Sequence, residues 1–190
     1  MLELLRRQTG DGPGVASVRE LEAMTSHSSL RTLRVVIGQF GGLSSIARSV
    51  SKALRDTGAT VMSTDEYEAA VQAAAANRFG ASVYIGFEAR SDARTLITYF
   101  AVPTFESVGG RALAARVVDG LRAVTGLPPA ELLGMRLQVL RETRMPAVLC
   151  SLGPVREVVD STNSVTVTIV DAVTRWAASP WSEHVASDPN

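Results

Sequence analysis

The stretch Leu33-Arg34-Val35-Val36-Ile37-Gly38 decides how the first part of this chain folds. Three consecutive β-branched apolar residues bounded by a glycine are typical of a buried β-strand. After Gly41-Gly42, apolar residues recur at helical spacing until Gly58, namely Ile46, Val50, Ala53 and Leu54. The sequence therefore predicts a strand, a glycine-rich loop and then a helix.

The same alternation continues along the chain. Further strands are predicted at 60–62, 82–87, 95–102, 136–140 and 147–151. Helices are predicted at 65–79, 107–124 and 165–178, with Asp65 and Ser107 as N-caps. Strands that alternate with helices predict an α/β fold, a mainly parallel sheet of about six strands, mixed at its edge, with helices on both faces. The strand at 95–102 is the candidate for that edge.

Length and composition limit the chain to one domain. Its 190 residues are 46% hydrophobic and 20% charged, which is enough for one well-buried core and hardly for two. We place this domain at 31–180, an appendage or linker at 1–30 and a polar tail at 181–190. Nineteen basic and nineteen acidic residues cancel, so nucleic acid is not an expected partner. The single cysteine, Cys150, excludes an internal disulfide framework.

Two features bear on where the protein is found. No uninterrupted apolar stretch approaches the roughly 20 residues of a membrane-spanning helix. The first leucines are interrupted by Glu3 and followed by Arg6 and Arg7, which is not the order of a secretory signal. We therefore expect a cytoplasmic protein as the chain is written, exported only if the N-terminus is incomplete. Because Lys52 is the only lysine, the arginine bias suggests a GC-rich bacterial genome.

Ligands of open α/β sheets bind outside the carboxyl ends of the strands. In this chain those ends fall at 38–42, 63–65, 88–92 and 151–154. The first of these segments is either an anion site at a helix N-terminus or a plain tight turn, and it lacks the lysine of a nucleotide P-loop. The charges Glu88, Arg90, Asp92 and Arg94 are either a site for a charged ligand or a solvated loop of self-compensating ion pairs.

A run near the end of the chain carries a resemblance to a known family. The run is Val139-Leu140-Arg141-Glu142-Thr143-Arg144-Met145-Pro146-Ala147-Val148-Leu149-Cys150-Ser151-Leu152-Gly153. It resembles the closing segment of the zinc-dependent N-acetylmuramoyl-L-alanine amidases, in their type 3 catalytic domain. Residues 75–85 and 107–121 resemble further family segments, and the likeness covers 33–178. It implies the amidase fold and a role in bacterial cell-wall metabolism, since these enzymes cleave the bond between muramic acid and the stem peptide of peptidoglycan.

The resemblance also implies where a metal site would lie. The family binds Zn²⁺ through two histidines and a glutamate, and a further glutamate activates the metal-bound water. In this chain the first histidine position is Phe40, before Gly41-Gly42, and the loop that presents the glutamate ligand is shortened. The second histidine position is Glu88, and the position of the catalytic glutamate is Ser151.

None of the expected metal ligands is present, so the resemblance implies a degenerate member that holds neither zinc nor another cofactor. The only histidines, His27 and His184, lie before the first predicted strand and in the tail. Cys150 follows Val148-Leu149 in an apolar strand and is expected to be a core residue. Because no histidine is placed to activate Ser151 or Cys150, catalysis is expected to be lost.

The remaining candidate residues would line a ligand pocket. They are Gln39, Phe40, Glu88, Arg90, Arg141, Glu142 and Ser151. For Arg141, Glu142 and the neighbouring Arg144, contact with a carboxylate-rich peptide and a purely structural network stay equally open.

Three functions follow from these observations. The first is a catalytically inactive module that binds a peptidoglycan fragment or precursor, or a cell-wall protein, and regulates by occupancy. The second is an active amidase that hydrolyses the muramoyl–L-alanine bond with a divergent zinc site. The third is a structural or oligomerisation domain, which an apolar, filled cleft around Phe40 and Phe87 would favour. The oligomeric state stays open.

Overall fold

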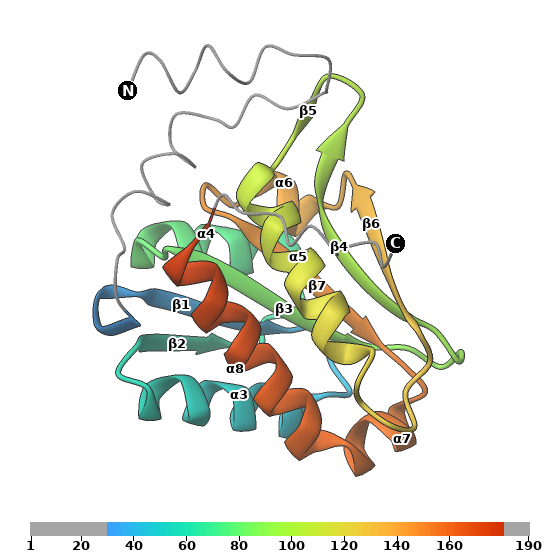
Figure 1. The fold of residues 1–190 in the computed structure, drawn as a ribbon. Helices are drawn as coiled ribbons and strands as arrows, with labels where there is room; N and C mark the ends of the chain where they lie inside the picture. Colours follow the sequence, from blue (N-terminus) through green and yellow to red (C-terminus); the bar gives the residue numbers. More distant parts are fainter. Residues whose placement is uncertain (1–29, 181–190) are drawn as a thin grey trace, which may run out of the picture.

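The structure, a computed structural model, describes residues 30–180 as a seven-stranded sheet packed between helices (Figure 1). The strands are β1 (Arg34–Gln39), β2 (Thr60–Thr64), β3 (Val83–Ala89), β4 (Thr95–Val102), β5 (Phe105–Glu106), β6 (Ala130–Met135) and β7 (Ala147–Leu152). The helices are η1 (Leu30–Thr32), α3 (Ser44–Asp56), α4 (Ala69–Phe79), α5 (Val108–Leu121), α6 (Gln138–Glu142), α7 (Val155–Asp160) and α8 (Thr162–Ala178). The predicted tail, and all but residue 30 of the predicted linker, lie outside the described residues.

The sheet is mainly parallel with a mixed side, as predicted. Its strand order is β2-β1-β3-β7-β4, and β6 pairs with the other side of β4. β1, β2, β3 and β7 run parallel to one another, whereas β4 runs antiparallel to β7 and parallel to β6. β5 forms a short antiparallel pair with the end of β4. β4 is therefore not an edge strand, because β7 and β6 flank it.

The segment between α5 and β7 differs from the prediction. Residues 136–140 are not a strand, since Gln138–Glu142 form α6 and the strand β6 lies earlier, at Ala130–Met135. β6 contains no β-branched residue and is half-exposed, so neither composition nor alternation marks it as a strand; its pairing with β4 does. α6 forms because Val139 and Leu140 are buried together with residues of α4.

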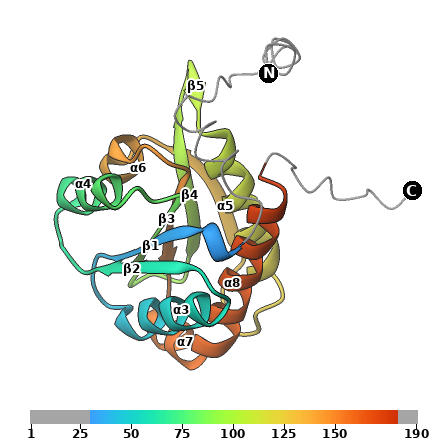
Figure 2. The same ribbon diagram turned by 90° about the vertical axis from the view of Figure 1, so that its left-hand side faces the viewer.

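The two faces of the sheet have separate hydrophobic cores. Helices α3, α5 and α8 cover one face, and α4 and α6 cover the other (Figure 2). Because side chains alternate along a strand, Val35 and Ile37 of β1 lie in the first core and Val36 lies in the second. We call these surfaces the α3 face and the α4 face. The expected helices on both faces are confirmed, and so is the opening strand and helix.

Most helix ends follow the predicted signals, but α5 ends at Leu121, before the predicted end at 124, and the start of α4 also differs. The hydroxyl group of Ser107 accepts a hydrogen bond from the backbone N–H of Gly110 at 3.0 Å and caps α5. Gly80 adopts the left-handed conformation, with φ of 66°, and ends α4. α4 starts at Ala69 and not at Asp65, because the preceding residues form a loop whose Glu66 carbonyl group is bound by the side chain of Gln72.

The last helix shows packing overriding local preference. Residues 165–168 alternate as in a strand, yet they lie inside α8. Val165, Ile169 and Val173 recur at helical spacing and are fully buried against the core that α3 and α5 share. α8 starts at Thr162, slightly before the prediction. Within residues 30–180, no helix is both long and apolar enough to cross a membrane.

Candidate functional site

Three of the predicted site residues lie side by side at the carboxyl ends of neighbouring strands. The backbone N–H of Phe40, just after β1, donates to the carbonyl oxygen of Phe87 at 2.8 Å, so Phe40 lies level with Glu88 of β3. Glu88 in turn pairs with Ser151 of β7. Strand alternation places the three side chains on the α4 face. We call Phe40, Glu88 and Ser151 the site row.

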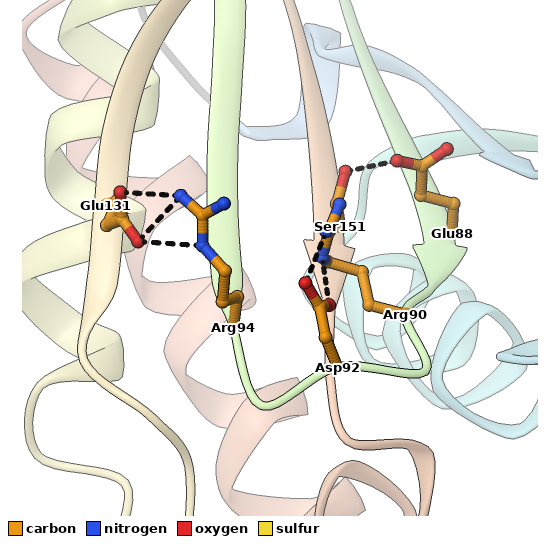
Figure 3. Close-up of polar contacts among 6 residues, drawn as sticks. All are labelled: Glu88, Arg90, Asp92, Arg94, Glu131 and Ser151. Carbon is orange, nitrogen blue, oxygen red and sulfur yellow. Dashed lines mark hydrogen bonds and ion pairs between the residues drawn. The ribbon is translucent and has the colours of Figure 1, made fainter.

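Within the site row, Ser151 and Glu88 bind each other. The hydroxyl group of Ser151 donates a hydrogen bond to Glu88 Oε1 (Figure 3). Ser151 is only 3% exposed. A nucleophilic serine needs an accessible hydroxyl group and a nearby base such as imidazole, and carboxylates bind protons far more weakly than imidazole. The arrangement therefore holds Ser151 in place and does not prepare it for attack on a substrate.

The first member of the site row, Phe40, packs into the core. Its half-buried ring lies against the cluster of the α4 face, which includes Val36, Tyr84 and Leu149. Phe87 is fully buried in the other cluster, on the α3 face. The two aromatic rings are thus on opposite sides of the sheet. The filled cleft around both rings, which would have favoured a purely structural domain, does not form.

Gln39 belongs to a different site from its neighbour Phe40. It lines a cavity of about 370 Å³ on the α3 face, between the ends of β1 and β2 and the first turns of α3. The lining residues are Ile37, Gln39, Ser44, Ala47, Arg48, Ser63, Thr64 and Asp65. The strand end at 63–65, which the topology argument singled out, therefore combines with Gln39 and not with the site row.

Charged residues beside the site row form ion pairs (Figure 3). Arg90 Nε and Nη2 donate to the two carboxylate oxygens of Asp92, both at 2.7 Å. This pairing raises the pKa of Arg90 and lowers the pKa of Asp92. Arg94 Nη2 binds Glu131 Oε2 at 3.1 Å. Glu131 lies in β6, so sequence reasoning, which missed that strand, also missed this partner.

Arg141 and Glu142 lie at the amino end of β7, whereas the site row lies at the carboxyl ends of the strands. They end α6, which precedes the amino end of β7, whereas Ser151 is near the carboxyl end of that strand. The two side chains bind each other, Arg141 Nη2 to Glu142 Oε1 at 2.8 Å, and this lowers the pKa of Glu142. They therefore share no pocket with Glu88 and Ser151, because only residues 143–146 connect them to the amino end of β7.

The segment around Arg141 shows features of both interpretations that the sequence left open. Asn77 Nδ2 donates to the carbonyl oxygen of Glu142 at 2.8 Å, and the backbone N–H of Arg144 donates to Asn77 Oδ1 at 2.9 Å, which is a structural network. Arg141 and Arg144 also line a second cavity, of about 200 Å³, together with apolar residues that include Phe100 and Met145.

A buried polar network, which sequence reasoning missed, lies beneath the loops of the carboxyl edge. The hydroxyl group of Tyr84 donates to Gln72 Oε1 at 2.7 Å, and both residues are fully buried. Gln72 Nε2 donates to the carbonyl oxygen of Gln39 at 2.9 Å and also to that of Glu66, so one side chain ties together the loops after β1 and β2. A Cβ atom at Gly38 would overlap Gln72 Oε1, so this approach requires glycine. The available signal was a lone glutamine in an alanine-rich helix.

Comparison with known proteins identifies the fold. No family model and no curated protein matches the chain. An N-acetylmuramoyl-L-alanine amidase from Clostridium difficile 630 superposes with a TM-score of 0.65 at 16% identity, over 78% of this chain and 98% of its own. The amidase AmiC2 of Nostoc punctiforme gives 0.62 at 20% identity, over 76% and 96%. The CwlD amidase of Clostridioides difficile, solved in complex with the GerS lipoprotein, gives 0.52 at 10% identity, over 75% and 97%.

This chain has the N-acetylmuramoyl-L-alanine amidase fold. The fold that the resemblance implied is thereby confirmed, and it extends over nearly the whole length of the compared amidases. At these identities the likeness is one of fold, so the chemistry has to be argued from the residues of the site row.

The donor set of the site row does not fit the zinc ion that an amidase fold implies. Zinc sites use imidazole, thiolate and carboxylate ligands, usually three or four together. The site row offers a phenyl ring, one carboxylate and a hydroxyl group bound to that carboxylate. In residues 30–180, no group of three or more His, Cys, Asp or Glu side chains is placed to hold a metal ion. His27 and His184 lie outside the described residues.

The neighbouring thiol does not change this conclusion. Cys150 directly precedes Ser151, but its side chain lies in the core of the α3 face and is fully buried. Burial raises the pKa of the Cys150 thiol to about 12, so it is neutral at physiological pH. A thiol that is neutral and inaccessible acts neither as a metal ligand nor as a nucleophile.

Proposed function

We propose that this chain is a catalytically inactive, amidase-like domain that acts as a regulatory module in bacterial cell-wall metabolism. It binds a peptidoglycan fragment or precursor, or a cell-wall protein. The site row is the observation that carries the proposal. Where the resemblance expects zinc ligands and a catalytic glutamate, Phe40 packs into the core and Ser151 is bound to Glu88. The scaffold is kept while the chemical groups are replaced, which favours binding over hydrolysis.

Two observations support a binding role. The compared structures are named as N-acetylmuramoyl-L-alanine amidases, and one of them is in complex with a lipoprotein. In addition, the carboxyl edge of the sheet, where α/β folds bind ligands, has a cavity large enough for a small molecule. Regulation by occupancy requires such a surface, but neither a metal nor a nucleophile.

The test combines zinc content, hydrolysis and binding, measured on one preparation of the full chain. We expect zinc far below one equivalent per chain after purification in the presence of zinc. We also expect no chelator-sensitive release of stem peptide from muropeptides. Isothermal titration with the same muropeptides, and capture of a cell-wall protein from a bacterial envelope extract, measure the two forms of binding. We expect saturation in one of them.

Two outcomes contradict the proposal in different ways. Stoichiometric zinc together with chelator-sensitive hydrolysis would establish an active amidase with a divergent metal site. The variants His27→Ala and His184→Ala would then show whether the histidines outside the described residues supply the ligands. Absence of both kinds of binding, with a folded protein, would remove the support for a regulatory module.

A further inference from the structure

The cavity on the α3 face contains two oppositely charged side chains without partners. Arg48 lies on α3 and Asp65 directly follows β2, and both are exposed at the cavity wall. In residues 30–180, neither side chain forms a hydrogen bond or an ion pair, with each other or with any other residue. The cavity is therefore charged at two separate points.

Three neutral side chains of the same cavity, those of Gln39, Ser44 and Ser63, form hydrogen bonds. Ser44 Oγ donates to Gln39 Oε1 at 3.2 Å, and the hydroxyl groups of Ser63 and Ser51 lie 2.9 Å apart. Elsewhere on this edge of the sheet, close charges bind each other, as Arg90 and Asp92 do. Arg48 and Asp65 are thus the charged groups in this cavity, and both are free to bind a ligand.

We propose that this cavity binds a zwitterionic amino-acid group, with its carboxylate at Arg48 and its ammonium at Asp65. The planar guanidinium of arginine binds carboxylates through two parallel hydrogen bonds, and a carboxylate accepts from an ammonium. A simple anion would be repelled by Asp65, and a simple cation by Arg48. A dipolar ligand satisfies both charges, and Ile37 and Ala47 provide an apolar wall for its carbon atoms. The volume of about 370 Å³ is in the range of small-molecule sites.

This inference deepens the proposed function and rests on it, since the same cavity supports the binding role proposed above; the cavity and the site row lie on opposite faces of the sheet. Two kinds of ligand present both an ammonium and a carboxylate group. A free amino acid has its two charges on neighbouring atoms, whereas a short peptide with free ends holds them several bonds apart. The experiment includes both and distinguishes them.

The experiment is isothermal titration of the full chain with four matched probes. The probes are alanine, alanyl-alanine, N-acetyl-alanyl-alanine and alanyl-alanine amide. We expect saturable binding of alanine or of alanyl-alanine, and affinity lower by about tenfold or more for both blocked dipeptides, because each lacks one charge. Equal binding of free and blocked dipeptides, or no binding of any probe, would overturn the inference.

Variants assign the binding to this cavity. Arg48→Gln and Asp65→Asn are each expected to weaken binding by about tenfold or more. Since both side chains are exposed and unpaired, the Tm of each variant should stay close to that of the parent chain.

Arg94→Gln is the matched control, because Arg94 lies at the same end of the strands but is paired with Glu131. The affinity of this variant for the probes should equal that of the parent chain. Unchanged affinity in Arg48→Gln would also overturn the inference. Zinc content and hydrolysis have no bearing on this result, so failure here is distinct from failure of the proposed function.

Discussion

The two faces of the sheet bury different kinds of groups. On the α3 face, the core is a continuous set of apolar side chains, with Phe87, Ile169 and Trp176 among the largest. On the α4 face, the apolar cluster is smaller and surrounds a buried hydrogen-bonded pair, Tyr84 and Gln72. The α4 face also carries the site row at its carboxyl edge.

The two faces therefore contribute differently: the core of the α3 face stabilises the domain, and the buried hydrogen bonds of the α4 face position loops. Apolar burial is non-directional and stabilises the domain in proportion to the area removed from water. Buried hydrogen bonds are directional, and the Gln72 side chain uses them to hold the loops at Gln39 and Glu66. The residues of the site row can therefore be substituted while the core on the α3 face keeps the domain folded.

The largest expected effect lies in the core of the α3 face. Phe87→Ala should lower the free energy of unfolding by about 3–5 kcal/mol, since it leaves a cavity in a fully packed cluster. The matched control is Phe40→Ala, on the other face, where the half-buried ring should account for only about 1–2 kcal/mol. Urea denaturation followed by circular dichroism measures both. Equal losses would contradict the contrast between the faces.

The buried polar pair should come next. Tyr84→Phe removes the donor to Gln72 Oε1 and leaves that oxygen buried and unpaired, so we expect a loss of about 1–3 kcal/mol in the free energy of unfolding. In the double variant Tyr84→Phe/Gln72→Leu, the second substitution removes the orphaned oxygen but also the bonds to the loops. Hydrogen exchange of the loop amides near Gln39 should therefore accelerate more in the double variant than in Tyr84→Phe. The opposite order would show that Gln72 does not hold the loop.

A smaller effect is expected in the site row. Ser151→Ala removes the hydroxyl group that donates to Glu88, and because Glu88 is half-exposed, water can replace that donor. The free energy of unfolding should fall by about 1 kcal/mol. Muropeptide binding should be unaffected if the pair is structural, and titration calorimetry would show it. A loss of muropeptide affinity in this variant would instead show that Ser151 contributes to ligand binding.

The smallest effect concerns the exposed ion pair beside the site row. Arg90 lowers the pKa of Asp92 in the folded protein below its ordinary value of 3.8. The pair therefore contributes stability at neutral pH, and this contribution is lost as the pH falls through the lowered pKa. Asp92→Asn should reduce stability slightly at pH 7, and the difference from the parent chain should shrink as the pH is lowered, as measured by the midpoint of urea denaturation. Arg90→Gln should give the same pH dependence; a difference that does not shrink as the pH falls would point to a cause other than this ion pair.

Most of the fold was predictable from local patterns. The first strand and helix, the N-cap at Ser107 and the end of α4 at Gly80 all follow from hydrophobic spacing and from the chemistry of helix ends. β6 was not predictable, because a half-exposed strand without β-branched residues acquires its conformation from its neighbour β4. α6 was not predictable either, because it depends on burial of Val139 and Leu140 against α4. The helix predicted at 165–178 is confirmed, although residues 165–168 alternate as in a strand, because Val165 and Ile169 are buried against two other helices.

The candidate site was predictable as a set of strand ends, but not as an arrangement. Phe40, Glu88 and Ser151 were found because family positions and strand ends coincide, and the structure brings them together. Gln39 was grouped with them wrongly, since adjacent residues of a strand face opposite sides of the sheet. Arg141 was also grouped with them wrongly, because almost the whole length of β7 lies between Arg141 and Ser151.

The amino-acid sequence alone determined the α/β alternation, the resemblance to the amidases and the residue types at the positions where that resemblance places zinc ligands, because each of these is a property of residue type and spacing. Only the tertiary structure decided which strand ends meet, which side of the sheet each side chain occupies, and which charges have a partner. Those properties depend on contacts between segments far apart in the chain: Tyr84 meets Gln72, Arg94 meets Glu131, and Arg48 meets no partner in the described residues.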